Sequence, residues 1–228
     1  MATLRRWVGA ALLTVASAAT LAACGESFEV NASRQVTAEL AVAGEGSIRI
    51  DLPAGEVTIR DDAEGRILVT GELIGRGATK ERAEARVGKM QLALESGENG
   101  AASLRLLHDG HNPAVDLEIR IPRGFELRAY LAAGRLVAAV EPSSSTQLDL
   151  EAGEVIALLP DTAAVTVDAR TTVGEVTVSG FSTRQGEAKR VDIVGAVFEG
   201  TIGDPNEAAS RQLRLRNQAG AIRLRPQG

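Results

Sequence analysis

The sequence predicts an all-β fold built as a β-solenoid with coils of about 20 residues. Two observations lead to this prediction. First, the phrase Gly153-Glu154-Val155 returns as Gly174-Glu175-Val176, 21 residues later. Second, aliphatic residues alternate with other residues after many glycines, and this alternation is typical of strands with one buried face. The pattern follows Gly46, Gly55, Gly65, Gly153, Gly174 and Gly220, with looser copies at Gly134 and Gly195.

The intervals between these glycines set the size of the coil. From Gly134 onward they are 19, 21, 21 and 25 residues. About 20 residues hold two short strands and two turns, which is one solenoid coil, and a glycine before each strand suits a corner with positive φ. An antiparallel sandwich would have a similar number of strands and is the alternative. The fixed interval favours the solenoid, because sandwiches do not repeat their sequence at a constant spacing.

Residues 1–23 have the layout of a secretory signal peptide. A short basic segment, MATLRRW, precedes an uncharged apolar run, VGAALLTVASAATLAA, which is too short for a transmembrane anchor. The tetrapeptide Leu21-Ala22-Ala23-Cys24 resembles the lipobox of bacterial lipoproteins. The resemblance implies cleavage before Cys24, a diacylglycerol on its thiol and an acylated amino group. We therefore expect a lipid-anchored protein of the bacterial cell envelope, in the outer membrane if the organism has two membranes.

Three segments are expected after the signal peptide. They are a lipidated N-terminal linker (24–34), an irregular β part (35–122) and a regular β-solenoid (123–228). Within the irregular part, the stretch GATKERAEARVGKMQL lacks alternation and is rich in Ala, Glu and Arg. This composition predicts one short helix near residues 78–88.

The segment LEIRIPRGFELRAYLAAGRLVAAV contains a strand ending in Ile-Pro, a glycine turn, a second strand and then Gly-x-Leu. Followed by Gly-x-Val repeats about 20 residues apart, it resembles the putative-adhesin β-strand-repeat family. This family is a domain of unknown function found in bacterial secreted proteins and lipoproteins. The resemblance covers nearly all of the mature chain. It implies a β-solenoid and an envelope location, and it brings no catalytic residues to this sequence.

Composition limits the classes of function. The mature part has 23 basic and 30 acidic residues, a net charge of −7, which gives no reason to expect a nucleic-acid partner. Cys24 is the only cysteine, so a disulfide within one chain is impossible. His108 and His111 flank Asp109-Gly110, a pattern that indicates a hairpin turn more than a metal site. The sequence contains neither a serine-nucleophile motif nor a phosphate loop. We expect no cofactor, no metal and no catalysis.

Glu154 and Glu175 are candidates for an acidic functional face. They hold the same position in successive coils, where strands would stack about 4.8 Å apart. Two carboxylates at this spacing could share a proton, bind calcium or flank a glycosidic bond. A carbohydrate-active enzyme is therefore the alternative function. The simpler interpretation is that outward positions of a solenoid are polar, as also expected for Asp149, Glu151, Asp168 and Asp192.

The C-terminal segment RQLRLRNQAGAIRLRPQG is basic, and no acidic residue follows Glu207. Alternation directs its arginines to solvent and its leucines to the core. As the last coil, this segment would cap the fold, and charges of one sign would oppose stacking with a second copy. The alternative is a basic patch that binds an anionic envelope polymer. The residues concerned are Arg214, Arg216, Arg223 and Arg225.

Together these features predict a lipid-anchored envelope protein whose non-catalytic β-solenoid is a binding, adhesion or assembly surface. Its expected partners are the membrane, through the N-terminal lipid, and an envelope polymer or protein. The sequence does not identify the ligand.

Overall fold

The computed structural model describes residues 30–42, 44–62, 65–109, 112–186, 188–191 and 194–227. The predicted signal peptide, Cys24, the linker as far as residue 29, His111 and Asp192 lie outside the described residues. The strands are β1 (Val30–Ala41), β2 (Ser47–Asp62), β3 (Arg66–Gly77), β4 (Gln91–Ser96), β5 (Ala101–Leu107), β6 (Ala114–Pro122), β7 (Glu126–Ala139), β8 (Thr146–Leu159), β9 (Val165–Val178), β10 (Arg184–Gln185), β11 (Ala188–Val191), β12 (Gly195–Ile202) and β13 (Gln212–Pro226). The helices are α1 (Lys80–Lys89) and α2 (Pro205–Ala208). Neither helix has the length and apolarity needed to cross a bilayer.

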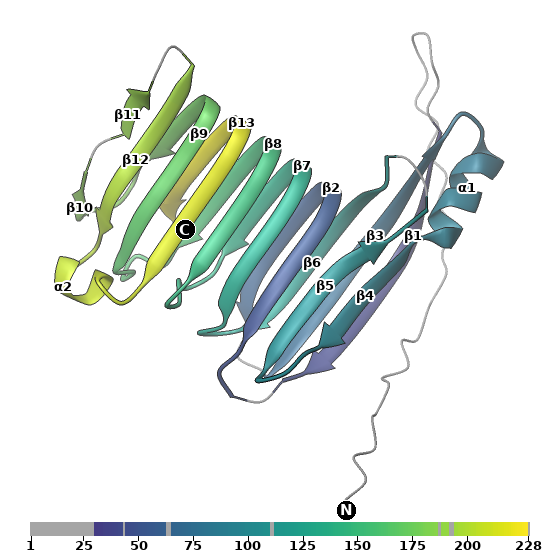
Figure 1. The fold of residues 1–228 in the computed structure, drawn as a ribbon, viewed down its shortest axis with the longest axis horizontal. Helices are drawn as coiled ribbons and strands as arrows, with labels where there is room; N and C mark the ends of the chain where they lie inside the picture. The colour runs from purple at the N-terminus through teal and green to yellow at the C-terminus, as the bar shows by residue number, and fades with distance from the viewer. Residues whose placement is uncertain are drawn as a thin grey trace, which may run out of the picture.

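The prediction of an all-β fold is confirmed. The strands form one 13-stranded sheet, with the order β1-β3-β6-β2-β7-β8-β13-β9-β12-β10 along its main path. The central strands β2, β7, β8, β13 and β9 run parallel to one another. Strands β1, β3 and β12 run antiparallel to their neighbours. The long central strands curl over at one edge, so that the sheet forms two facing layers (Figure 1).

The prediction of a β-solenoid is not confirmed, because the sheet is mixed in direction and is not closed. Strand β13, the last in the chain, lies between β8 and β9, whereas coils of a simple solenoid would stack in chain order. The segment that begins at Gly195 is also not a further coil, since it forms β12 and runs antiparallel to β9. Strand β2 pairs with β7 in parallel, so one sheet continues across residue 122.

A glycine lies at the bend of each central parallel strand. These glycines face one another in register in the order Gly55, Gly134, Gly153, Gly220 and Gly174, and we call them the glycine ladder. Their φ angles lie between 123° and 132°, a region that other residues rarely adopt. A Cβ atom on Gly153 would lie 1.9 Å from the carbonyl oxygen of Gly134. The sequence period therefore reflects a bend at which only hydrogen atoms fit between neighbouring strands.

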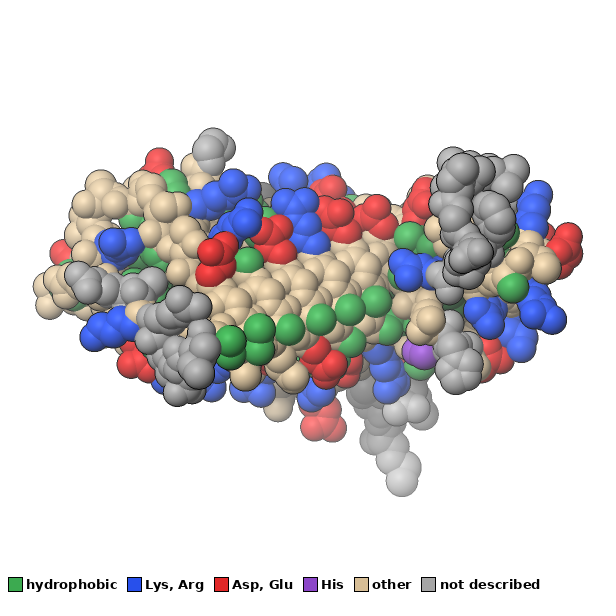
Figure 2. Space-filling model, turned by 90° about the horizontal axis from the view of Figure 1, so that it is seen from above, with side chains coloured by type: hydrophobic (Ala, Val, Ile, Leu, Met, Phe, Trp, Pro, Cys, Tyr) green, Lys and Arg blue, Asp and Glu red, His purple; other side chains and the backbone are tan. Residues whose placement is uncertain are grey.

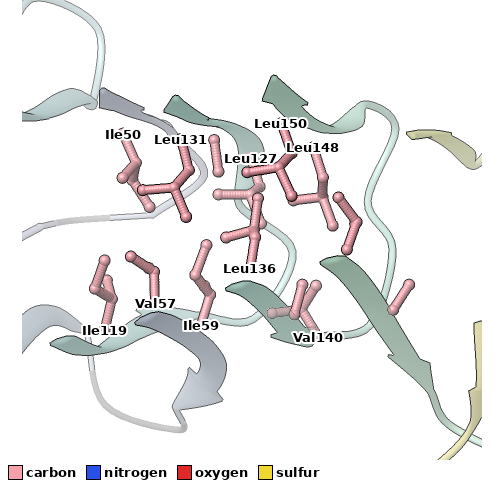
Figure 3. Close-up of a cluster of buried hydrophobic side chains, with 14 of the residues drawn as sticks. Ile50, Val57, Ile59, Ile119, Leu127, Leu131, Leu136, Val140, Leu148 and Leu150 are labelled. Carbon is pink, nitrogen blue, oxygen red and sulfur yellow. The ribbon is translucent and has the colours of Figure 1, made fainter. Parts of the chain in front are cut away.

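Aliphatic side chains fill the space between the two layers. Ile50, Leu131 and Leu150 come from the strand halves before the bend, and Val57 and Leu136 come from the halves after it (Figure 3). All are 2% exposed or less. The residues predicted to point inward are also buried, since Val155, Val176 and Leu224 are 0%, 6% and 0% exposed.

Helix α1 covers the end of the core beside β1 and β3 (Figure 1). It overlaps the segment in which a helix is predicted, and the Thr79 hydroxyl caps it by accepting a hydrogen bond from the Arg82 backbone N–H. Ala83 and Val87 are buried against β3. A Cβ on Gly75 would lie 2.6 Å from the Ala83 carbonyl oxygen, so this glycine permits the close packing. Strand β1 begins at Val30, inside the segment expected to be a linker.

The glycine ladder can be tested by adding a single methyl group. Gly153→Ala is expected to lower the free energy of unfolding by about 3 kcal/mol or more, because it combines a strained φ with a backbone clash. Gly88→Ala is the matched control, since a Cβ at this position of α1 has no atom within 4 Å and alanine favours helix by up to about 1 kcal/mol. Urea unfolding followed by circular dichroism measures both changes. Equal effects of the two substitutions would contradict the ladder.

Candidate functional site

The basic C-terminal strand does not cap the fold. Strand β13 pairs with β8 on one side and with β9 on the other along nearly its full length, so neither edge is free. The prediction of a protective end coil is therefore wrong, because β13 inserts between two strands that precede it in the chain. Its arginines extend from the outer faces of the two layers instead. Arg214 and Arg216 precede the bend, and Arg223 and Arg225 follow it.

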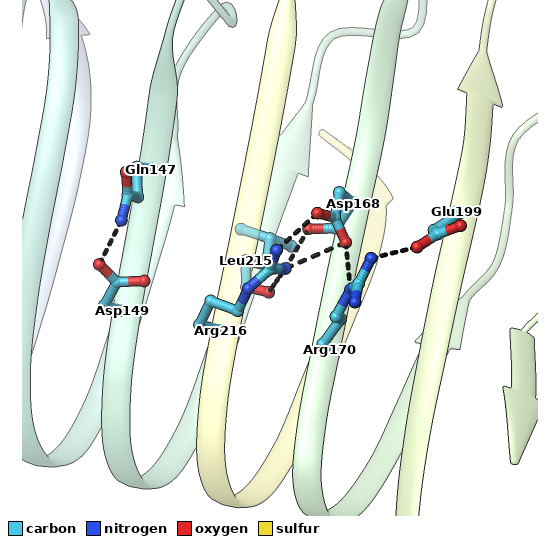
Figure 4. Close-up of polar contacts among 7 residues, drawn as sticks. All are labelled: Gln147, Asp149, Asp168, Arg170, Glu199, Leu215 and Arg216. Atoms are coloured by element: carbon cyan, nitrogen blue, oxygen red, sulfur yellow. Dashed lines mark hydrogen bonds and ion pairs between the residues drawn. The ribbon is translucent and has the colours of Figure 1, made fainter. Parts of the chain in front are cut away.

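Arg216 is held by a carboxylate of β9. Its Nη1 and Nη2 donate to the two carboxylate oxygens of Asp168 at 3.0 and 2.5 Å, and Arg170 Nε donates to the same carboxylate at 2.9 Å (Figure 4). Arg170 also donates to Glu199 of β12. Burial opposes ionisation of Asp168, but the hydrogen bonds from Arg216 and Arg170 outweigh it and lower the pKa of this carboxyl. Since Arg216 and Arg170 are cross-strand neighbours, the carboxylate offsets a repulsion between like charges. This group has a structural role.

The predicted acidic pair does not form. Ala221 of β13 lies opposite both Glu154 and Glu175, so the two acidic residues are two strand spacings apart, about 9.6 Å. Glu154 forms ion pairs with Arg223 at 2.9 Å and with Arg135 at 3.4 Å. The prediction that these carboxylates are adjacent assumed that β8 and β9 are neighbouring strands. It is wrong because β13 lies between them.

A line of carboxylates runs beside the glycine ladder. Glu72, Asp116 and Glu56 lie opposite one another on β3, β6 and β2. Burial raises the pKa of Asp116, and the nearby charges of Glu56 and Glu72 raise it further. Among the described residues, no group of three or more His, Cys, Asp or Glu side chains could hold a metal ion.

A strip of small apolar side chains borders the glycine ladder on its other side. These residues are Ala54, Ala133, Ala152, Ala219 and Val173, which are neighbours in register; the first two are half-buried and the other three are exposed. Figure 2, which looks onto the bend edge, shows bare backbone between a line of hydrophobic and a line of charged side chains. The strip is flat and about 19 Å long at ordinary strand spacing.

An open cleft of about 960 Å³ lies at the opposite edge, where turns connect the strands. Its lining includes the charged residues Glu45, Arg123, Glu126, Glu141 and Arg211 and several serines. A second cleft of about 540 Å³ shares Arg123 and Glu141 with it and adds Arg60 and Asp61. We call the two together the loop-edge cleft.

Hydrogen bonds fix the carboxylates of the loop-edge cleft. The Glu141 backbone N–H donates to Asp61 Oδ2 at 2.6 Å, and Arg211 Nη1 donates to Glu141 Oε1 at 2.6 Å. The Ser144 hydroxyl donates to Glu126 Oε1 at 2.7 Å. Burial is the largest influence on Asp61 and raises its pKa, although the Glu141 N–H and the charge of Arg123 act against it. Two arginines remain available, because no carboxylate of the described residues lies within 4.0 Å of the Arg60 or Arg123 guanidinium.

The cleft therefore offers guanidinium donors and carboxylate and hydroxyl acceptors, and its surface is more polar than apolar. Such a set can bind a charged or hydroxylated ligand by hydrogen bonds and ion pairs. This site was not identified from the sequence because its residues come from segments far apart in the chain, as with Asp61 and Glu141, which are 80 residues apart. The available signal was a charged residue directly after an aliphatic strand, as in IRDD, IPRG and VEPSSS.

No family model matches this sequence, and no curated protein matches it. Among solved structures, a putative cell adhesion protein from Clostridium sporogenes has a TM-score of 0.48 and 12% identity, covering 86% of this chain and 100% of that chain. A putative adhesin from Bacteroides fragilis has a TM-score of 0.21 and 9% identity, over 84% and 97%. A putative lipid binding protein from Parabacteroides distasonis has a TM-score of 0.24 and 7% identity, over 64% and 56%. Two of these descriptions agree with the resemblance seen in the sequence, but similarities this distant carry no argument about function.

Asp61→Asn is expected to stabilise the protein at neutral pH and to change little at about pH 3. Because the folded-state pKa of Asp61 is raised, the folded protein keeps a proton that the unfolded chain releases, and stability falls as pH rises through the interval between the two pKa values. The amide oxygen still accepts the Glu141 N–H but cannot ionise. Urea unfolding at both pH values measures the effect.

Asp109→Asn provides a control of opposite sign. The hydrogen bond from Lys89 lowers the pKa of Asp109, so this substitution should remove stability that is present at neutral pH and lost as the pH falls. Parallel pH profiles for Asp61→Asn and the wild type would show that the burial of Asp61 does not affect its ionisation.

Proposed function

We propose that this protein is a lipid-anchored cell-envelope protein that binds an anionic, hydroxyl-rich polymer through the loop-edge cleft and is not an enzyme. The observation that carries the proposal is the lining of the cleft. Arg60 and Arg123 are exposed and have no carboxylate within 4.0 Å among the described residues. Such guanidinium groups bind carboxylates, sulfates or phosphates of a ligand by charge-assisted hydrogen bonds.

The shape of the cleft favours an extended chain as the ligand. Sites for small molecules are mostly enclosed and apolar, whereas this cleft is open and is lined by charged and hydroxyl groups. Its side chains also stand at the ends of paired strands and are hydrogen-bonded to one another, as with Arg211 and Glu141. Such a pre-ordered surface loses little entropy when a ligand binds.

The non-catalytic part of the proposal is supported by the positions of the acidic residues. A glycosidase requires two carboxyl groups on either side of the scissile bond. Glu154, one member of the pair suggested by the sequence, is held by Arg135 and Arg223 instead of facing Glu175. The carbohydrate-active alternative therefore loses the pair on which it depended.

The envelope location rests on the lipobox at Cys24. Two or more acyl chains anchor a protein stably, whereas one chain is marginal. Cys24→Ser is expected to give an unprocessed or released protein that leaves the detergent phase on Triton X-114 partitioning. The wild type should partition into the detergent phase. If both proteins partition alike, the anchor assignment is wrong.

Polymer binding can be tested with polygalacturonate as an anionic probe and dextran as a neutral one. The wild type should bind polygalacturonate in a salt-sensitive manner and should not bind dextran. The double variant Arg60→Ser/Arg123→Ser is expected to bind at least about tenfold more weakly, since each hydrogen bond to a charged group contributes about 1.5–3 kcal/mol. Isothermal titration calorimetry measures the constants.

The double variant Arg49→Ser/Arg128→Ser removes the same charge from exposed positions on the outer sheet face and should bind like the wild type. An equal loss in both variants would indicate attraction by net charge alone. A wild type that does not bind the anionic probe would exclude this ligand class.

A further inference from the structure

The end of the molecule that carries α1 lies next to the point where the chain leaves the predicted anchor. Strand β1 begins at Val30, six residues after Cys24, and six residues span at most about 20 Å. Val30 pairs with Gly77 of β3. A Cβ on Gly77 would lie 2.7 Å from the Ala83 nitrogen and 3.0 Å from the Arg82 Cβ. The tether therefore keeps the surface around α1 close to any membrane that holds Cys24.

The other end of the molecule lies beyond the reach of this tether. Seven strand spacings separate β1 from β9 in the sheet, which is about 34 Å. Helix α2 and β12 lie at that far end, as Figure 1 shows. A short tether to one end thus determines which part of the body faces the lipid.

Basic side chains outnumber acidic ones on the surface around α1. Arg76, Lys80, Arg82, Arg86 and Lys89 are all exposed, and we call them the α1 basic patch, whereas the exposed acidic residues of the helix are Glu81 and Glu84. Lys80 pairs with Glu84 at 3.7 Å and Lys89 with Asp109 at 3.0 Å. In the described part of the chain, Arg76, Arg82 and Arg86 have no carboxylate within 4.0 Å. Arg86 Nη1 donates a hydrogen bond to the Arg76 carbonyl oxygen. Figure 2 shows more blue than red side chains at this end, on the right of the view.

The position of this patch is informative because the mature chain as a whole is acidic, with a net charge of −7. An anionic surface would repel most of the body. Charges interact across water only within about 8 Å at physiological ionic strength, so the charge nearest the membrane decides the interaction. The buried face of α1 consists of Ala83 and Val87, which pack on the core, so the helix is not free to insert its apolar side into lipid as interfacial helices do.

We propose that the α1 basic patch docks on the anionic phospholipid headgroups of the membrane that holds the lipid anchor. The guanidinium groups of Arg76, Arg82 and Arg86 bind lipid phosphates, since this group forms paired hydrogen bonds to phosphate oxygens. Docking fixes the orientation of the body and directs the α2 end away from the bilayer. The proposal rests on the lipid anchoring in the proposed function.

The orientation can be measured on the acylated full chain in vesicles. Because Cys24 is the only cysteine and acylation consumes its thiol, a spin label can be placed at Ala85→Cys on the exposed side of α1 or at Ser210→Cys near α2. A relaxing agent bound to the headgroups should affect the Ala85 label strongly and the Ser210 label little in vesicles containing phosphatidylglycerol. The effect on the Ala85 label should fall in phosphatidylcholine vesicles and at high salt. Equal effects on both labels, or no dependence on lipid charge, would overturn the proposal.

Charge variants separate docking from anchoring. Unacylated Cys24→Ser protein should bind phosphatidylglycerol vesicles in co-sedimentation, and the added substitutions Arg76→Ser, Arg82→Ser and Arg86→Ser should weaken this binding at least about tenfold. The control Arg128→Ser, Arg214→Ser and Arg225→Ser removes the same charge elsewhere and should change it little. One outcome is that the native chain is not acylated while the unacylated protein still binds phosphatidylglycerol through these arginines. That result would contradict the lipid anchor and support docking through the α1 basic patch. If neither the lipid charge nor the three arginine substitutions alter vesicle binding, docking through the α1 basic patch is wrong, and the proposal of a lipid anchor is unaffected.

Discussion

The close approach of backbones at the glycine ladder is the constraint on which the rest of the structure depends. At each bend the Cα of one glycine faces the carbonyl oxygen of its neighbour, and a Cβ would lie between 1.8 and 2.0 Å from that oxygen. The positive φ of each glycine turns the strand back over the core without breaking its pairing with the next strand. Contacts of Cα–H with carbonyl oxygen recur between such strands and are weakly favourable. Because all the bends are aligned, the layers before and after them can face each other over their whole length.

The aligned bends also determine what the two layers can contain. Side chains alternate between a thin aliphatic core and the outer faces, and large aromatic side chains are rare in the chain as a whole. At the bend of β13, buried Asn217 donates to the Gly153 carbonyl oxygen at 2.9 Å and to that of Ala221 at 3.2 Å. On the outer faces several charges are paired within or across strands, as in the group of Asp168, Arg170 and Arg216. Exposed pairs of this kind contribute little stability, but they neutralise charge along the sheet.

Two of the surfaces that carry arginines without a carboxylate partner among the described residues are the loop-edge cleft and the α1 basic patch. At the loop edge, the end of β2 places Arg60, and the turn after β6 places Arg123, beside an open cleft. At the N-terminal end, α1 and the end of β3 place Arg76, Arg82 and Arg86 beside the first residue of β1. In register, Arg60 faces Arg120 and Ala139, and Arg76 faces Asn31, so the neighbouring strands supply no carboxylate to either. If the protein docks on the bilayer through α1, the strands from β2 to β12 extend away from the membrane. The loop-edge cleft then stays accessible.

The sequence by itself determined the features that depend on near neighbours in the chain. Alternation identified the strands and the inward positions of Val155 and Leu224, and the glycine period identified the bends, because both are properties of a few consecutive residues. The tertiary structure decided which strands pair, since that depends on the total packing of segments far apart in the chain. The insertion of β13 between β8 and β9 separated Glu154 from Glu175 and gave Arg216 its partner Asp168. The same long-range pairing brought Asp61 to the backbone of Glu141, a contact that no local pattern encodes.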